Sequence, residues 1–266
     1  MVRAREGGGL HGQHAVVTGG GRGIGAAIAK ALAAQGADIT LLGRTSSSLE
    51  DLAGTLRGEL GTKVHTAVCD VSDPDDVGRA FASALRRLGS VQILVNNAGQ
   101  ADAGRFETIT LDTWNRLIAV NLTGTFLCSQ QVLPAMIAAR AGRIVNIAST
   151  AGLKGYSRLA PYCASKHGVI GLTRALAAET ARTGITVNAV CPGYTEGTEM
   201  LTMAVENVMR RKGVVAEDAR ERLAGLSPRG TLVSLQEVAD AVVWLCSSGA
   251  SAITGQAIAV AGGEVM

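Results

Sequence analysis

The chain has 266 residues, which is enough for one large α/β domain or two small ones. Hydrophobic residues make up 47% of the sequence, so disorder is excluded as the main state and a sizeable core is expected. Lys and Arg number 25 against 22 Asp and Glu, and this net charge of +3 is too small for a nucleic-acid-binding surface.

The cysteines and the start of the chain predict where the protein works. The five cysteines are scattered and form no C-x-x-C pair, so we expect no disulfide framework, no metal site and a cytoplasmic location. Residues 1–13 begin with basic residues but contain no apolar run, which excludes a secretory signal. No stretch approaches the roughly 20 apolar residues that cross a bilayer, so no membrane association is expected.

Short β-branched runs alternate with Ala- and Leu-rich segments along the whole chain. Near-continuous apolar strands between helices predict a parallel sheet of about seven strands with helices on both faces. Right-handed crossovers then give a doubly wound α/β fold, in which ligands bind beyond the carboxyl ends of the strands. We expect strands at 14–18, 38–42, 64–69, 91–95, 143–148, 185–190 and 256–260, and helices at 23–35, 47–59, 74–88, 111–138, 161–182 and 235–248.

The chain contains no linker, internal repeat or low-complexity block. Its only change of composition is at residues 199–226, which are rich in Met, Arg and Glu and predict one or two amphipathic helices. We therefore expect a single domain over residues 1–266, with residues 197–227 inserted as a small substrate-binding lobe.

A glycine-rich turn follows the first predicted strand and leads directly into a helix. Glycines allow a sharp turn and a close approach of a pyrophosphate, and the helix start offers free N–H groups to that anion. A glycine-rich loop without a ligand is the alternative, and a Walker loop is excluded because no Gly-Lys-Ser/Thr follows. The candidate dinucleotide-binding residues here are Gly19, Gly21, Arg22, Gly23, Ile24 and Gly25.

The end of the second predicted strand indicates which dinucleotide is bound. An acidic residue at this point would bind the adenosine ribose of NAD, but the sequence has Arg44 and no carboxylate. Arg44 and Arg22 lie on adjacent strand-to-helix turns, where two guanidinium groups can bind a 2′-phosphate. We predict NADP (NADPH) rather than NAD, with two ordinary solvated charges as the alternative.

Tyr162 and Lys166 are one helical turn apart, so they lie on one face of their predicted helix. A nearby ammonium stabilises a phenolate, and we expect Lys166 to lower the pKa of Tyr162 from its usual value near 10. Such a phenol can exchange a proton with a carbonyl or alcohol oxygen, to which Ser149 could also donate a hydrogen bond. A nucleophilic role for Ser149 is disfavoured because no histidine lies in a triad-like context.

With these motifs in this order, the chain resembles a short-chain dehydrogenase/reductase over nearly its full length. The resemblance implies a Rossmann-type fold, with Tyr162 as the proton donor in reduction and Ser149 as the residue that orients the carbonyl. It also implies that Lys166 holds the nicotinamide ribose and that Asn121 holds a water in a proton relay. The further cofactor contacts that it implies are Asp70, Val71, Asn97, Gly99, Pro192, Gly193 and Thr195.

Within this family, residues 159–200 are most similar to ketoreductases that act on β-ketoacyl thioesters, including aromatic-polyketide ketoreductases. The resemblance implies NADPH-dependent reduction of a ketone, such as a 3-oxoacyl thioester or a polyketide-like carbonyl, to a secondary alcohol. One alternative is an NAD-linked alcohol, 3-hydroxyacyl-CoA or steroid dehydrogenase that works oxidatively. A non-catalytic dinucleotide-binding sensor is the alternative of another class.

Two features concern partners. The run Arg210-Arg211-Lys212 in the predicted lobe is either a solvated helix face or a contact for an acidic acyl carrier protein or for coenzyme A phosphates. The helices expected at 111–138 and 161–182 carry Ala- and Leu-rich faces, and relatives commonly form tetramers or dimers through them. We therefore expect a homo-oligomer that acts on a small-molecule ketone or an acyl thioester.

Overall fold

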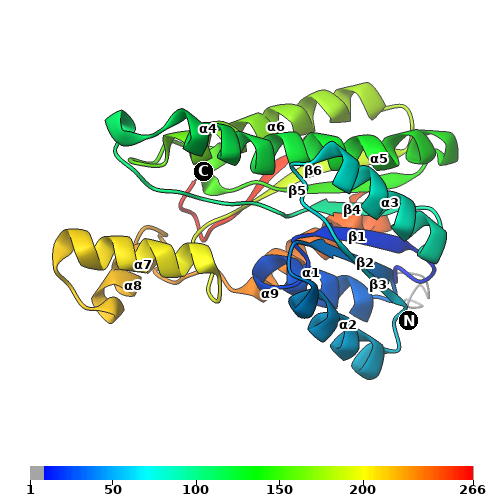
Figure 1. Cartoon of the computed structure of the whole chain (residues 1–266), viewed down its shortest axis with the longest axis horizontal. Helices are drawn as coiled ribbons and strands as arrows, with labels where there is room; N and C mark the ends of the chain where they lie inside the picture. Colours follow the sequence, from blue (N-terminus) through cyan, green and yellow to red (C-terminus); the bar gives the residue numbers. More distant parts are fainter. Residues whose placement is uncertain (1–8, 266) are drawn as a thin grey trace, which may run out of the picture.

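The computed structural model describes residues 9–265, which form a single parallel sheet with helices on both faces (Figure 1). The strand order is β3-β2-β1-β4-β5-β6-β7, with seven strands in all. This confirms the predicted Rossmann-type doubly wound fold. The strands are β1 His14–Thr18, β2 Asp38–Gly43, β3 Val64–Val68, β4 Ile93–Asn96, β5 Gly142–Ile147, β6 Ile185–Pro192 and β7 Ala257–Val260.

The strand order reverses between β1 and β4, which are hydrogen-bonded neighbours although β2 and β3 separate them in the sequence. Val17 of β1 pairs with Val95 of β4, so Thr18 and Asn96 end their strands side by side. Connections leave these two strands toward opposite faces of the sheet, and a crevice opens between them. The fold therefore places the glycine-rich turn after β1 next to the segment after β4.

Helices cover each face of the sheet with apolar side chains (Figure 1). Leu32, Leu49 and Val242 belong to one buried cluster, and Phe81 and Met136 belong to the cluster on the other face. Strands covered on both faces need apolar side chains on both, which explains their near-continuous hydrophobic runs. Helices α1 Gly23–Ala34, α2 Ser46–Leu60 and α9 Leu235–Cys246 cover one face, while α3 Pro74–Leu88, α5 Gly124–Ala139 and α6 Ala160–Thr180 cover the other.

The ends of several helices follow from local sequence signals. Asp73 precedes α3, and its Oδ1 accepts hydrogen bonds from the backbone N–H of Asp75 at 2.8 Å and of Asp76 at 3.1 Å. Pro74 occupies the first turn of α3, where its missing N–H costs nothing. Ser234 and Glu237 form a reciprocal capping box at the start of α9. These caps explain why α3 and α9 both begin at their predicted residues.

The single helix predicted at 111–138 is divided in the structure. Helix α4 Leu111–Ile118 leads into a π-helical turn at Ala119–Thr123, after which α5 begins. The side chain of Asn121, in this wider turn, is 1% exposed. Because its hydrogen-bond partners lie on other elements, the sequence period alone did not reveal the interruption.

Residues 197–227 contain two further helices, α7 Glu199–Lys212 and α8 Ala216–Ala224. They pack on each other through a small apolar cluster that includes Leu201, Val205 and Leu223. In Figure 1 the pair projects beyond the carboxyl ends of the strands. Short 3₁₀ turns at Phe106–Thr108, Thr150–Gly152 and Ser248–Ala250 complete the described elements.

Two expectations concern the chain as a whole. All five cysteines are free and buried. Among residues 9–265, no helix is both long enough and apolar enough to cross a membrane. Most of the segment examined for a secretory signal, namely residues 1–8, lies outside the described residues, as does residue 266.

Candidate active site

A cavity of about 680 Å³ lies at the carboxyl ends of the strands and extends under α7. It collects almost every site residue expected from the sequence. Gly25 and Asn121 are the exceptions, because they lie behind its wall rather than on it. The predicted residues that line the cavity are Gly19, Gly21, Arg22, Gly23, Ile24, Arg44, Asp70, Val71, Asn97, Gly99, Ser149, Tyr162, Lys166, Pro192, Gly193 and Thr195.

The glycine-rich turn has the shape that a pyrophosphate requires. Gly23 has a φ of +52°, a conformation that L side chains rarely adopt. A Cβ at Gly25 would lie 2.3 Å from the carbonyl oxygen of Gly19, so only glycine lets the helix approach the strand this closely. No side chain of the described residues caps the start of α1, which leaves its first amides for another acceptor. The turn therefore fits a dinucleotide phosphate.

Asn97 holds this turn in place. Its Nδ2 donates to the carbonyl oxygens of Thr18 at 3.0 Å and of Gly19 at 3.2 Å. The Thr18 hydroxyl in turn accepts from the backbone N–H of Asn97 and of Ala98, both at 3.0 Å. The amide group of Asn97 is therefore engaged with the protein itself, and Asn97 shapes the cofactor side of the cavity by fixing the turn.

The two arginines proposed for a 2′-phosphate both line the cavity, together with Gly43 and Ser48. Arg22 forms an exposed ion pair with Glu199 in the first turn of α7. Arg44 makes no ion pair with another residue of the described chain. The arrangement fits an anionic group at this end of the cavity, and a phosphate there would compete with Glu199 for Arg22.

The side chain of Asp70, which follows β3, forms hydrogen bonds within its own turn. Its Oδ1 accepts from the Ser72 backbone N–H at 2.9 Å and from the Ser72 hydroxyl at 2.6 Å. The backbone N–H of Asp70 donates to Asp76 at 3.0 Å. This network fixes Asp70 and Val71 at the wall of the cavity next to the glycine-rich turn.

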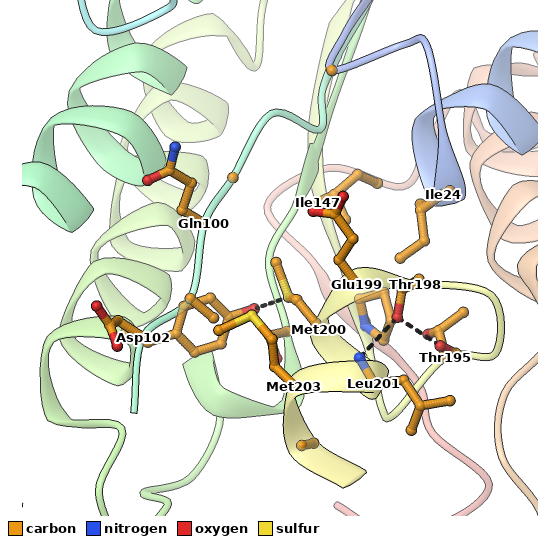
Figure 2. A pocket seen from close by; sticks show the side chains of 18 of the residues that line it. Ile24, Gln100, Asp102, Ile147, Thr195, Thr198, Glu199, Met200, Leu201 and Met203 are labelled. Atoms are coloured by element: carbon orange, nitrogen blue, oxygen red, sulfur yellow. Dashed lines mark hydrogen bonds between the residues drawn. The ribbon is translucent and has the colours of Figure 1, made fainter. Parts of the chain in front are cut away.

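Ser149 and Tyr162 lie on the opposite side of the cavity. Ser149 ends the segment after β5, and its Oγ accepts from the backbone N–H of Ala151 at 3.1 Å. Tyr162 lies in the first turn of α6, and its phenol donates a weak hydrogen bond to the Met200 Sδ at 3.6 Å. The phenol therefore points at α7, from which Met200 and Met203 reach into the cavity (Figure 2).

Burial controls the titration of this group. Loss of water around the phenol raises the pKa of Tyr162 to about 12, although the neighbouring Ser149 hydroxyl opposes the rise. Burial also lowers the pKa of Lys166 to about 8. The expected lowering of the Tyr162 pKa by Lys166 is therefore wrong for this structure, because desolvation of the phenol outweighs other effects. The Lys166 Nζ lies 5.7 Å from the centre of the Tyr162 ring and donates to the Ile147 carbonyl at 2.8 Å.

Asn121 lies close to Lys166 but bonds to other groups. A Cβ at Gly99 would be 3.3 Å from the Asn121 Oδ1 and 3.4 Å from the Lys166 Nζ, so both side chains reach the same point. The Asn121 Oδ1 accepts from the Gln100 backbone N–H at 2.8 Å, and its Nδ2 donates to the Gln100 carbonyl and to Ser165, both at 2.9 Å. Its role as the holder of a water stays a prediction.

The sequence analysis missed several residues that line the substrate side. Asp102 and Gln100 both accept hydrogen bonds from Arg116, at 2.9 and 2.8 Å. Tyr156 and Met200 also line the cavity. None of these four residues lies in a recognisable motif, because loop segments carry no periodic signal. Only the Met-rich composition of the lobe indicated apolar contacts at this place.

Similarity to known proteins extends over most of the chain. The family model described as short chain dehydrogenase matches residues 13–208. A protein of Streptomyces violaceoruber, provisionally named ketoacyl reductase 1 of the granaticin polyketide synthase, is 46% identical over 94% of this chain and 92% of its own. The 3-oxoacyl-acyl-carrier-protein reductase FabG of Aquifex aeolicus is 37% identical over 96% of this chain and 98% of its own.

A solved structure shows the same similarity in three dimensions. A crystal structure of a single-residue variant of actinorhodin polyketide ketoreductase with NADPH superposes with a TM-score of 0.90 at 41% identity. The match covers 94% of this chain and 96% of that chain. The similarity therefore extends over nearly the whole fold.

Proposed function

Because the chain belongs to the short chain dehydrogenase family of NAD(P)-dependent oxidoreductases and its relatives support a ketone reductase, we propose that it reduces a 3-oxoacyl thioester or polyketide-like ketone with NADPH. The observation that carries the proposal is the convergence of Ser149, Tyr162 and Lys166 on the cavity that the glycine-rich turn also lines. NADPH, when bound, supplies the hydride for the carbonyl carbon.

The side chains of this protein orient the ketone and provide the proton. Ser149 and Tyr162 donate hydrogen bonds to the ketone oxygen, and Tyr162 transfers its proton to that oxygen as negative charge develops. Lys166 holds the nicotinamide ribose, and the turn at Gly23 holds the pyrophosphate. The cavity walls position the two reactants against each other, which removes much of the entropic barrier.

The titration of Tyr162 fits its proposed role as the proton donor. A phenol whose pKa is raised to about 12 keeps its proton near neutral pH and is a donor. The reductive direction itself is proposed from the relatives, which are ketoacyl reductases.

NADPH is proposed over NADH on the charges at the end of β2. Arg22 and Arg44 line the cavity there, and no carboxylate of the described residues ends β2 to bind a ribose 2′-hydroxyl. The actinorhodin ketoreductase structure contains NADPH, which agrees with this choice. The 2′-phosphate would gain charge-assisted hydrogen bonds from both guanidinium groups.

A thioester substrate is supported by two cations that line the cavity. Arg210 and Arg211 of α7 line it beside Met203, so an anionic carrier group could bind where the apolar part of the substrate enters.

We also propose that residues 197–227 are the substrate-binding lobe of a single domain and that the protein is a cytoplasmic dimer or tetramer.

The proposal is tested by following NADPH oxidation with a panel of cyclic ketones and 3-oxoacyl thioesters. Tyr162→Phe removes only the proton donor, so we expect kcat to fall by about 100-fold or more. NADPH binding, measured by its fluorescence, should change by less than about twofold because the ring remains. Wild-type protein that oxidises NADPH with no ketone of the panel, or a Tyr162→Phe variant with normal turnover, would refute the proposal.

A further inference from the structure

A carboxylate near the end of the chain is buried beside the cavity. The Glu264 side chain is only 3% exposed and forms an ion pair of 3.3 Å with the Lys154 Nζ. Lys154 also donates to the Glu264 backbone carbonyl at 3.2 Å, and the Tyr156 phenol donates to the Glu264 Oε1. A carboxylate is rarely buried to this degree unless several groups hold it. Glu264 is therefore the centre of a defined polar cluster.

The hydrogen bonds of Tyr156 give this cluster a direction. The phenol has one proton, and a carboxylate can only accept, so Tyr156 donates to Glu264. The Thr150 hydroxyl lies 2.8 Å from the Tyr156 oxygen and therefore donates to it. Burial and the Glu264 carboxylate both raise the pKa of Tyr156, which keeps the phenol protonated. The chain of donors thus runs from Thr150 through Tyr156 to Glu264.

This chain of donors begins next to a residue of the proposed reaction. Thr150 follows Ser149 directly and opens the 3₁₀ turn that Ser149 caps through the Ala151 N–H. Tyr156 and Thr150 both line the cavity. A shift of Tyr156 would therefore move the backbone that carries Ser149 as well as the wall that faces the substrate.

A separate observation places Glu264 against Gly193. A Cβ at Gly193 would lie 3.1 Å from the Glu264 Oε2, which is closer than ordinary van der Waals contact, so a side chain at residue 193 would push on the carboxylate. Gly193 follows β6 and lines the cavity. Glu264 therefore contacts the segment after β5 and the segment after β6, which follow neighbouring strands of the sheet.

We propose that Glu264 is a positioning residue for the reduction: it holds Tyr156 and Thr150, and through them Ser149, in the geometry that binds the ketone oxygen. This rests on the proposed function. Glu264 touches neither reactant, and its contribution reaches the ketone only through the Tyr156–Thr150 hydrogen bonds. The C-terminal segment after β7 is then part of the substrate site rather than a passive end of the fold.

The test compares Glu264→Ala, Glu264→Gln and Tyr156→Phe, with Glu107→Gln as the matched control. Glu107 also forms an ion pair, with Arg105, but its side chain is 62% exposed and does not line the cavity. We expect Glu264→Ala and Tyr156→Phe to lower kcat about tenfold with a smaller change in KM. Glu264→Gln keeps an oxygen acceptor for Tyr156 and should recover part of that loss, while the control keeps wild-type kcat.

Two further readouts separate positioning from general stability. The double variant Tyr156→Phe/Glu264→Ala should be no slower than either single variant, because both remove the same chain of hydrogen bonds. Hydrogen exchange at the amides of residues 150–156, measured without substrate, should be faster in both single variants than in the wild type. If Glu264→Ala fails to fold, Glu264→Gln and Tyr156→Phe supply the same comparisons.

The outcomes that test the role of Glu264 are distinguishable from those that test the proposed function. A wild type that reduces no ketone refutes the proposed function, and unchanged exchange at residues 150–156 then refutes the role of Glu264. With an active wild type, normal kcat in Glu264→Ala and Tyr156→Phe overturns the inference even if Tm falls. A double variant whose losses multiply also overturns it, because the two residues would then act separately.

Discussion

At the scale of single residues, Tyr162 and Lys166 show how burial and charge compete. Both side chains lie within the wall of the cavity, with 6% and 3% of their surface exposed. Burial disfavours the phenolate and the ammonium alike, so it raises one pKa and lowers the other. Lys166 keeps a hydrogen bond to the Ile147 carbonyl, which a neutral amine can also donate. Near neutral pH, Tyr162 therefore carries its proton and Lys166 is still largely charged.

This titration predicts the pH dependence of the enzyme. Because the pKa of Lys166 is lowered to about 8, the ammonium that we propose holds the ribose is lost as the pH rises through that value. We expect kcat/KM for NADPH, measured at saturating ketone, to be level below pH 7 and to fall roughly tenfold between pH 7 and 9. Tyr162 adds no break in this range, since its pKa is raised to about 12.

Lys166→Arg provides the control, because a guanidinium stays charged up to high pH. Its profile should lack the break near pH 8, whatever its absolute rate. A wild-type profile that is level to pH 9.5 would contradict the prediction. The same group affects the free energy of unfolding in the opposite direction. Between the folded-state pKa of about 8 and the ordinary value of 10.5, the folded protein binds fewer protons at Lys166 than the unfolded chain does. This contribution therefore favours folding as the pH rises through that range.

At the scale of elements, α7 brings charge to the mouth of the cavity. Its last turn carries Arg210, Arg211 and Lys212, and the first two line the cavity. Cations in the last turn also interact favourably with the helix dipole, so part of this pattern serves α7 itself. The position at the cavity mouth is what distinguishes these residues from other charged helix ends.

Charge reversal in α7 tests whether these arginines bind an anionic carrier. In Arg210→Glu/Arg211→Glu we expect KM for a coenzyme A thioester to rise about tenfold, because attraction to the phosphates becomes repulsion. KM for a small cyclic ketone should stay within about twofold. Arg222→Glu is the matched control, since Arg222 is an exposed arginine in the last turn of α8 and does not line the cavity. An equal rise for both substrates would refute the carrier contact.

The π-helical turn at Ala119–Thr123 is an element-scale feature that the sequence did not reveal. Residues 111–138 carry a continuous helical pattern, and π turns have no strong local signal. The Asn121 side chain bonds to the Gln100 backbone and to Ser165, which belong to the segment after β4 and to α6. Contacts between elements therefore stabilise the turn, and they exist only in the folded protein.

At the scale of the whole molecule, the cavity joins the two halves of the sheet to the lobe. One part of its wall comes from the segments after β1 to β4, and the rest comes from the segments after β5 and β6, from α6 and from α7, whose places in the fold are seen in Figure 1. The Arg22–Glu199 ion pair connects the glycine-rich turn to α7. A ligand that fills the cavity therefore contacts segments from most of the chain and should stabilise the entire fold.

This stabilisation predicts the cofactor preference without any assay of turnover. NADPH at about 100 times its Kd should add about 2.7 kcal/mol to the free energy of unfolding and raise Tm by roughly 5 to 10 °C. NADH at the same concentration should raise Tm less, because Arg22 and Arg44 find no 2′-phosphate. Arg44→Ala should narrow the difference, and Arg86→Ala, at an exposed position on α3, should not. An equal or larger shift with NADH would contradict the preference.

The sequence by itself determined the doubly wound sheet, its strands and the residues of the glycine-rich turn and of α6. These depend on local patterns, namely apolar runs, helical spacing and glycines that tolerate unusual backbone angles. Tertiary structure alone decided the raised pKa of Tyr162, the π turn at Asn121 and the cluster around Glu264. Each of these three features depends on burial or on partners distant in the sequence, and none of them can be predicted from neighbouring residues.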